Sequence, residues 1–281
     1  MGSRIRLAVL GFGRFGRVHA ARARAHPAFE VACVVDPDAQ ARADAQAQGF
    51  EAIASLDALP QCVQAAAVVT PADTHAELAV ALMHRGVDVL VEKPLAESEQ
   101  GIDAMLDAVR QTGRRLFTGH IERFNQSLTD LPWDRAPGRL VFQRQSRLQG
   151  TARSVVLDLM VHDLDLASYL LQGEGDGSFQ ILDARTQGDG LQVQVRMGDT
   201  RVDFHARHGA DASLASMGWG DDTSAWSELA LSRPPGLNQS DALTRQYTAF
   251  HHMLQGQDSP LADAQAGAIA ARRALAIVAA L

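Results

Sequence analysis

Short apolar runs alternate with longer amphipathic segments over the first part of the chain. Runs of this length, too short for buried helices, are typical of strands that are buried on both faces of a parallel sheet. They lie at 7–10, 31–35, 65–69, 87–91 and 115–118, and helix-like segments lie at 17–25, 40–49, 73–85 and 98–112. The alternation predicts a doubly wound α/β sheet, in which ligands bind beyond the carboxyl ends of the strands.

The pattern changes after about residue 120. A strand-like segment at 139–148 and a helix-like segment at 155–171 come first, and strands are then expected at 179–186, 191–197, 201–206, 213–219 and 228–231. Helices are expected at 241–254 and 262–281. A helix followed by consecutive hairpins predicts an α+β domain with an open, mostly antiparallel sheet. Because 281 residues exceed a typical single domain, we expect two domains, 1–119 and 120–281, with the closing helix packed back on the first.

Three glycines, Gly11, Gly13 and Gly16, follow the first apolar run with the spacing G-x-G-x-x-G. In a dinucleotide-binding turn the first permits a tight turn, the second lets backbone approach a pyrophosphate, and the third lets helix pack on strand. Asp36 ends the second run, where a carboxylate would bind a ribose 2′-hydroxyl and repel a 2′-phosphate. The sequence therefore favours NAD as the cofactor. The alternative is a βαβ unit whose glycines end a strand and whose Asp36 caps the next helix.

Lys93 stands two residues beyond a buried run, between Glu92 and Pro94. At the carboxyl end of a parallel strand, a lysine can face the ligand crevice and take part in the chemistry there. The alternative is an ordinary surface lysine in a turn.

Asp158 and His162 lie four positions apart in a predicted helix, and Asp165 follows three positions later on the same side. A carboxylate placed in this way can orient an imidazole and fix its tautomer, as general acid–base catalysis requires. A solvated polar stripe is the alternative. We expect no metal, because no cysteine or second histidine completes the set at ligand spacing.

A polar cluster comes directly after the last parallel run: His120, Glu122, Arg123 and Asn125. Its place at the end of the sheet favours contact with a substrate, and Arg123 suits an anionic group of that substrate. The alternative is an interdomain linker held by its own hydrogen bonds.

Composition narrows the class of protein further. A net charge of −7 argues against a nucleic-acid partner, and no apolar run is long enough to span a membrane. Cys33 and Cys62 are too few for a disulfide framework, so we expect both in the core of a cytoplasmic protein.

Four motifs together resemble the Gfo/Idh/MocA family of NAD(P)-dependent oxidoreductases: G-F-G-R-F-G at 11–16, T-P-A-D-T-H at 70–75, E-K-P at 92–94 and D-L-M-V-H-D-L-D at 158–165. The resemblance covers essentially the whole chain. It implies an N-terminal Rossmann domain and a second domain whose open sheet often assembles dimers or tetramers, so we expect a homodimer or homotetramer. It also implies that Lys93 is the active-site lysine, His162 the acid/base and Asp158 its carboxylate partner.

The predicted contacts extend beyond these three residues. Cofactor contacts are expected at Gly11, Phe12, Gly13, Arg14, Phe15, Gly16, Asp36, Thr70, Pro71, His75, Glu92 and Lys93, although His75 also suits an ordinary helix face. Substrate contacts are expected at His120, Glu122, Arg123, Asn125 and Asp165.

The segments 119–125 and 155–165 look most like the UDP-N-acetylglucosamine 3-dehydrogenase branch of that family, in which NAD oxidises the sugar 3-hydroxyl to a ketone. We therefore expect an NAD-dependent dehydrogenase acting on a CH–OH group of a sugar or nucleotide-sugar. Two alternatives stay open. One is a dehydrogenase of free sugars, inositols or other polyols, and the other is a regulator that senses NAD or NADH without turnover.

Overall fold

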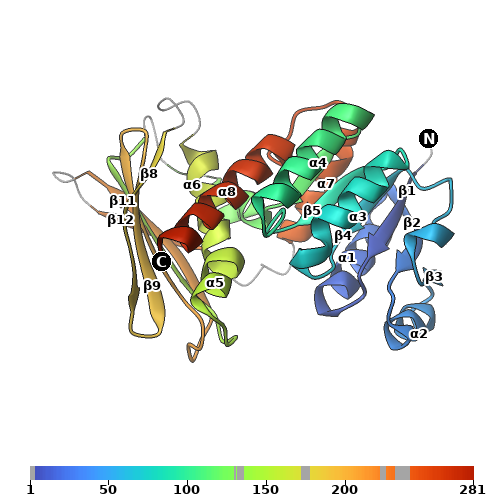
Figure 1. Ribbon diagram of the computed structural model, residues 1–281, viewed down its shortest axis with the longest axis horizontal. Helices are drawn as coiled ribbons and strands as arrows, with labels where there is room; N and C mark the ends of the chain where they lie inside the picture. The colour runs from blue at the N-terminus through green and yellow to red at the C-terminus, as the bar shows by residue number, and fades with distance from the viewer. Residues whose placement is uncertain (1–3, 130, 132–135, 172–177, 222–225, 232–240) are drawn as a thin grey trace. The chain divides into compact units, whose positions relative to one another are not determined.

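The computed structural model describes residues 4–129, 131, 136–171, 178–221, 226–231 and 241–281 (Figure 1). The chain forms two compact units, Met1–Ile121 with Ser240–Ala268 and Glu122–Gln239 with Ile269–Leu281. Each unit is therefore built from two separate segments of the chain.

The first unit is organised around a seven-stranded sheet with the order β13-β6-β5-β4-β1-β2-β3. Its parallel strands are β1 (Ile5–Leu10), β2 (Phe29–Val35), β3 (Ala52–Ile53), β4 (Ala65–Val68), β5 (Asp88–Glu92) and β6 (Leu116–Gly119). Every residue of β4 and β5 is buried, as expected of strands covered on both faces. The strand order reverses between β1 and β4, where a doubly wound sheet binds its ligand.

Helices connect these strands and cover the sheet. They are α1 (Arg14–Ala25), α2 (Ala39–Ala47), α3 (His75–His84) and α4 (Glu99–Thr112), with short 3₁₀ turns at Leu56–Ala58 and Ala72–Thr74. Right-handed crossovers place α1 and α2 on one face and α3 and α4 on the other, because the two pairs progress in opposite directions from β1 and β4. The later helix α7 (Ala242–Leu254) returns to pack against α1.

The C-terminal segment differs from its expected form. A helix over 262–281 is predicted, but Ala262–Asp263 form the short strand β13, which pairs antiparallel with Thr118 and Phe117 of β6. Helix α8 (Ala264–Ala280) begins only after it. The edge of the sheet offers these two residues backbone partners, and the Asp263 carboxylate then accepts the Ala266 N–H at 2.9 Å.

The second unit contains a six-stranded sheet with the order β12-β11-β7-β10-β9-β8. Its strands are β7 (Arg139–Gln145), β8 (Phe179–Gln187), β9 (Gly190–Met197), β10 (Thr200–Arg207), β11 (Leu214–Gly220) and β12 (Ser227–Ala230). All neighbours are antiparallel except β7 and β10. The predicted fold class, a doubly wound parallel sheet and an open, mostly antiparallel one, is confirmed.

One face of this second sheet carries the core, and Figure 1 shows α6 (Val161–Leu170) beside it. The stacked rings of Phe142 and Phe204, 5.6 Å apart, lie at its centre. The single α-helix predicted over 155–171 is interrupted. A short turn at Ala152–Ser154 leads into a π-helical segment, Val155–Met160, before α6 begins. The wider turn buries three successive apolar side chains, Val155 to Leu157.

Two further expectations concern single features. Cys33 is buried as predicted, but Cys62 is exposed in a turn before β4, so its expected place in the core is wrong. Within the described ranges, no helix combines the length and the apolar character needed to cross a membrane.

Candidate functional site

The glycine-rich turn lies between the ends of β1 and β4 and is closely packed. Gly11 adopts a φ of +88°, and a Cβ there would lie 2.7 Å from the Val69 carbonyl oxygen that follows β4. A Cβ on Gly16 would lie 2.1 Å from the Gly11 carbonyl oxygen. A Cβ on Gly13, in contrast, would meet nothing within 4 Å. Gly11 and Gly16 thus serve the packing of the turn, whereas Gly13 leaves open space above it.

The open space faces the start of α1, where anions are favoured. Gly13 is the N-cap residue of this helix and provides no side-chain cap for its first N–H groups. Arg14 and Phe15 are exposed beside it, while the Phe12 ring is buried against Phe50 at 5.8 Å. Uncapped N–H groups beside an open glycine fit the pyrophosphate of a dinucleotide.

Asp36 fixes this turn from the end of β2. Its Oδ2 accepts the N–H of Phe12 at 2.7 Å, and its Oδ1 accepts the N–H of Asp38 at 2.9 Å. Each carboxylate oxygen keeps a lone pair, so the group can still accept a ribose hydroxyl. Arg42 of α2 donates to the carbonyl oxygens of Asp36 and Pro37, at 2.9 and 2.8 Å.

The ends of β4 and β5 are joined by His75. Its buried ring bridges the Thr70 carbonyl oxygen, 2.9 Å from Nε2, and the Pro94 carbonyl oxygen, 2.9 Å from Nδ1. Thr70 and Thr74 meet through their hydroxyls at 2.6 Å. The predicted cofactor residues of the T-P-A-D-T-H motif thus lie together with the turn that carries Lys93.

Lys93 directly follows β5 and is partly exposed, and the Lys93–Pro94 peptide bond is cis. It is also the single lysine among the 26 lysines and arginines of the chain, a signal that motif reading missed. All the other residues of this set are arginines. Because arginine cannot lose its proton in a protein, a lone lysine at this turn favours chemistry over simple charge.

Glu92 lies beneath Lys93 with its side chain buried. Its Oε2 accepts the Lys93 N–H at 3.3 Å, and its Oε1 lies 3.3 Å from Nε2 of His19. Burial opposes ionisation of this carboxyl, but His19 and the Lys93 charge outweigh it and lower the pKa of Glu92. Glu92 is therefore held as a carboxylate.

In the second unit, Asp158 lies in the π-helical segment and His162 in the first turn of α6. Both side chains are partly exposed, whereas the adjacent Leu157, Val161 and Asp163 are buried. The two candidate catalytic residues therefore stand at an accessible strip of an otherwise buried segment. π-helical turns occur frequently at functional sites.

The other predicted substrate residues of this unit are engaged in ion pairs and hydrogen bonds with one another and with their neighbours. Arg123 donates to both oxygens of Asp165, at 2.8 and 2.6 Å, and its guanidinium lies 4.9 Å from the Tyr169 ring centre. Asn125 donates to Glu122 at 3.0 Å and to the Leu231 carbonyl oxygen at 2.8 Å. These are bonds of the kind that the linker interpretation expects, and a substrate contact by these residues stays a prediction.

Arg144 of β7 also forms buried ion pairs, and the sequence did not predict them. It donates to Asp163 at 2.6 Å and to Glu122 at 2.8 Å, and all three side chains are largely buried. The alternating pattern of β7 gives no sign of it, because Arg144 occupies a position where the strand faces inward. His120, in the first unit, is buried directly after β6. Across the part of the chain that the structure describes, no three histidine, cysteine or acidic side chains are grouped as metal ligands.

Both the sequence and the fold of the chain are similar to those of known proteins. Residues 5–120 match the model of the Gfo/Idh/MocA oxidoreductase family, NAD-binding Rossmann fold. A UDP-N-acetylglucosamine 3-dehydrogenase of Acidithiobacillus ferrooxidans is 33% identical over 175 residues, which cover 60% of this chain and 55% of the relative. A scyllo-inositol 2-dehydrogenase (NAD(+)) of Bacillus subtilis is 29% identical over 62% of this chain and 56% of its own length. The chain thus spans little more than half the length of these curated relatives.

The solved structure of the UDP-N-acetylglucosamine 3-dehydrogenase GnnA from Acidithiobacillus ferrooxidans superposes with a TM-score of 0.84. The superposition covers 100% of this chain and 98% of the other at 25% identity. A dinucleotide-binding turn at the switch point of a doubly wound sheet, in a chain whose second unit is an open, mostly antiparallel sheet, defines a two-domain protein of the nicotinamide-cofactor-binding class. The match to the Gfo/Idh/MocA oxidoreductase family thus covers residues 5–120, and the fold similarity extends over the whole chain. The expected NAD cofactor agrees with this NAD-binding family.

Proposed function

We propose that the protein is an NAD-dependent dehydrogenase of a secondary alcohol on a sugar or nucleotide-sugar, with the 3-hydroxyl of UDP-N-acetylglucosamine as the favoured substrate group. The observation that carries the proposal is Lys93, the single lysine of the chain, at the carboxyl end of β5 in the same unit as the glycine-rich turn. The similarity to the Acidithiobacillus ferrooxidans enzyme supports the choice of substrate.

NAD, when bound, supplies the hydride acceptor. Its pyrophosphate would be held by the N–H groups of 13–16 and its adenosine ribose by Asp36, with Thr70, Pro71 and Glu92 nearer the nicotinamide end. His162 would accept the hydroxyl proton of the alcohol as the hydride leaves the alcohol carbon, and Asp158 would orient the imidazole. Lys93 donates a hydrogen bond to the same oxygen and stabilises the negative charge that develops there.

A second candidate function is the oxidation of free inositols or other polyols. The Bacillus subtilis scyllo-inositol dehydrogenase, at 29% identity, favours it. Both candidates use the same residues for hydride and proton transfer. They differ in whether affinity depends on a nucleotide group.

The test is the absorbance of NADH at 340 nm when purified protein, NAD and a panel of UDP-sugars, free sugars and inositols are combined. Turnover with UDP-N-acetylglucosamine alone supports the favoured proposal, and turnover with a free polyol alone replaces it with the second candidate. NAD binding without multiple turnover in either direction, including reduction of 3-keto sugars, would instead leave an NAD-sensing regulator.

We also propose that the protein assembles as a homodimer or homotetramer through the open face of the second sheet. Gln143, His205 and Arg207 lie on this face, across β7 and β10, and are at least partly exposed. Light scattering on the eluted protein measures the assembly, and a monomer at micromolar concentration would refute it.

A further inference from the structure

A buried chain of three polar side chains runs behind the Lys93 turn. The Glu92 carboxylate at the end of β5 lies 3.3 Å from Nε2 of His19 on α1. Nδ1 of the same ring lies 3.0 Å from the hydroxyl of Tyr247 on α7. His19 and Tyr247 are both completely buried, and Glu92 nearly so. Among the described residues, His19 Nε2 and Glu92 Oε1 have no hydrogen-bond partner, and each has the other as its charge partner.

The direction of the contacts follows from the ionisation of the two ends. His19 and Lys93 keep the pKa of Glu92 low, so this group only accepts. Burial and the Glu92 charge raise the pKa of Tyr247, so the phenol keeps its proton. The Tyr247 O–H therefore donates to Nδ1 of His19, which leaves Nε2 of the ring to carry the hydrogen that faces Glu92.

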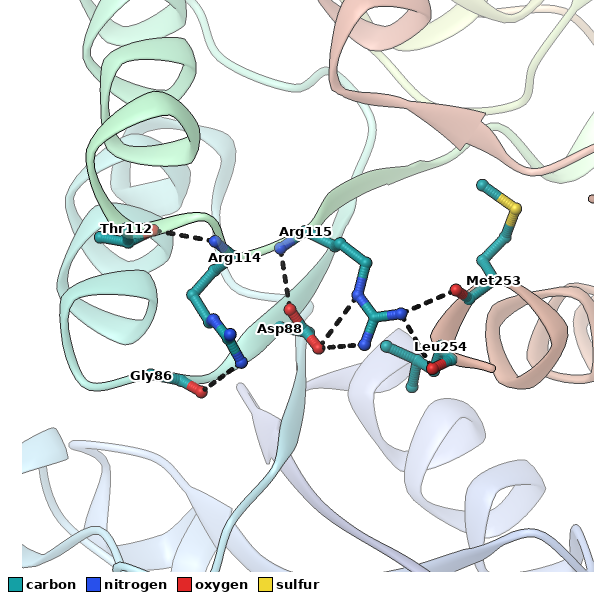
Figure 2. A network of polar contacts seen from close by, with 7 residues as sticks. All are labelled: Gly86, Asp88, Thr112, Arg114, Arg115, Met253 and Leu254. Carbon is teal, nitrogen blue, oxygen red and sulfur yellow. Dashed lines mark hydrogen bonds and ion pairs between the residues drawn. The ribbon is translucent and has the colours of Figure 1, made fainter. Parts of the chain in front are cut away.

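Within the first unit, hydrogen bonds from α1 and from the residue before β6 hold helix α7 at its two ends. These bonds fix the position of Tyr247. At its start, Arg22 of α1 donates to the N-cap residue Asp241 at 2.6 Å. At its end, Arg115 donates to the carbonyl oxygens of Met253 and Leu254, both at 2.8 Å (Figure 2). The same guanidinium also binds Asp88 at the start of β5, at 2.6 Å.

The neighbouring strand leaves room for the carboxylate. A Cβ on Gly119, the last residue of β6, would lie 2.3 Å from Oε1 and 2.8 Å from Cδ of Glu92. Only glycine at this position leaves the space that the Glu92 side chain occupies. The position of the carboxylate is thus determined by β6 on one side and by His19 on the other.

We propose that His19 and Tyr247 are positioning residues that hold the Glu92 carboxylate in place beside Lys93. Both side chains are completely buried, so neither is accessible to a substrate. Helix α7, far from Lys93 in sequence, thereby takes part in the machinery of the lysine turn. The inference rests on the proposed function only for the catalytic role of Lys93.

The test uses the single lysine as a reporter. Protein labelled with ¹³C at the lysine ε-carbon gives one lysine signal, which shifts when the adjacent Glu92 gains its proton. We titrate the protein, without NAD or substrate, from pH 8 to pH 2.5. Glu92→Gln removes the titrating group and identifies the inflection, and thermal unfolding of every variant shows that it is folded.

In the wild type we expect the inflection below the usual range of a glutamate. Tyr247→Phe should move it upward by about half a pH unit, and His19→Leu by more, because burial then acts on Glu92 with less compensation. His19→Gln, which keeps a donor toward Glu92, should restore most of the wild-type titration. Thr248→Val is the matched control, because it removes a hydroxyl of the same helix that contacts His26, at 3.1 Å, and not His19.

Activity gives the second readout. Tyr247→Phe should lower kcat about fivefold, with KM for NAD within twofold and the acidic limb of the rate profile displaced, while Thr248→Val stays at the wild-type value. The same inflection in wild type, Tyr247→Phe and folded His19→Leu would overturn the inference, even in a fully active enzyme. An inactive wild type with the expected titrations would overturn the proposed function and leave the positioning of Glu92 standing.

Discussion

The Phe12 N–H donates to the Asp36 carboxylate at 2.7 Å, which ties the glycine-rich turn to the end of β2. Asp36 therefore has two tasks, since it shapes the turn and is also expected to bind the ribose. Asp36→Ser should weaken NAD binding about tenfold or more and allow NADP to bind, because the repulsion of a 2′-phosphate is removed and Arg42 lies close by.

Fluorescence titration with NADH and NADPH measures this preference. Asp38→Asn is the matched control, because asparagine still caps α2 and leaves Asp36 intact. A double variant, Asp36→Ser with Arg42→Gln, should lose the acquired NADPH affinity. Unchanged preference in Asp36→Ser would mean that the adenosine ribose binds elsewhere.

Two of the glycines should respond in opposite ways to alanine. Gly13→Ala should leave the free energy of unfolding within about 0.5 kcal/mol of the wild type but abolish NAD binding, because its methyl group would enter the space left for the pyrophosphate. Gly16→Ala should destabilise the fold by about 1–3 kcal/mol, because its Cβ would collide with the Gly11 carbonyl oxygen.

Chemical denaturation and NADH fluorescence, measured on the same two variants, separate these effects. Ala152→Gly, at an exposed helix position, is the control and gives the background change in the free energy of unfolding. Gly188→Ala is unsuitable as a control, because Gly188 has a positive φ. NAD binding by a stable Gly13→Ala protein would place the pyrophosphate away from α1.

Lys93→Met should lower kcat by a factor of about 10² to 10⁴ and leave NAD binding nearly intact. Lys93→Arg keeps the positive charge but not the compact ammonium, and we expect it to recover little of the lost rate. Steady-state kinetics, followed by the absorbance of NADH at 340 nm, checks both variants with the substrate that the panel of sugars and inositols identifies. Wild-type turnover in Lys93→Met would remove this residue from the mechanism.

Arg144→Met should destabilise the second unit by about 3–5 kcal/mol, because it leaves Asp163 and Glu122 buried without a cation. Burial already raises the pKa of Asp163. A raised pKa in the folded state contributes stability that is present at low pH and lost as the pH rises through that pKa.

The Arg144→Met variant should therefore be more stable at pH 5 than at pH 8. Thermal unfolding across this range measures the trend, and adding Asp163→Asn should flatten it. Equal losses at both pH values would show that packing of the Arg144 stem, and not charge, dominates.

The order of strands and helices could be predicted because each buried run is short and bounded by turn residues. A contact between Asp36 and the glycine-rich turn could also be expected, because the dinucleotide-binding motif places a carboxylate beside that turn. Tyr247 could not be predicted, because nothing in the periodicity of α7 shows that its hydroxyl meets a histidine 228 residues earlier. The ion pair of Arg144 and Asp163 could not be predicted for the same reason. A buried charge at an inward-facing position contradicts the local pattern and depends on a distant partner.

The sole lysine was readable from the sequence and needed only a count of residue types. The π-helical segment around Asp158 was not readable, because an apolar run in a π turn has nearly the same local signature as in an α-helix. The spacing between Asp158 and His162 was therefore interpreted with α-helical geometry, whereas Asp158 lies on a wider turn.

The first unit is completed by α7 and β13, which belong to the segment Ser240–Ala268. During synthesis, the glycine-rich turn and the Lys93 turn leave the ribosome long before the residues that buttress them. The whole second sheet is made in between. The nascent cofactor-binding unit therefore keeps the α1 surface around His19 and Arg22 uncovered until the segment Ser240–Ala268 emerges. Chaperone binding to that surface would matter most during this period.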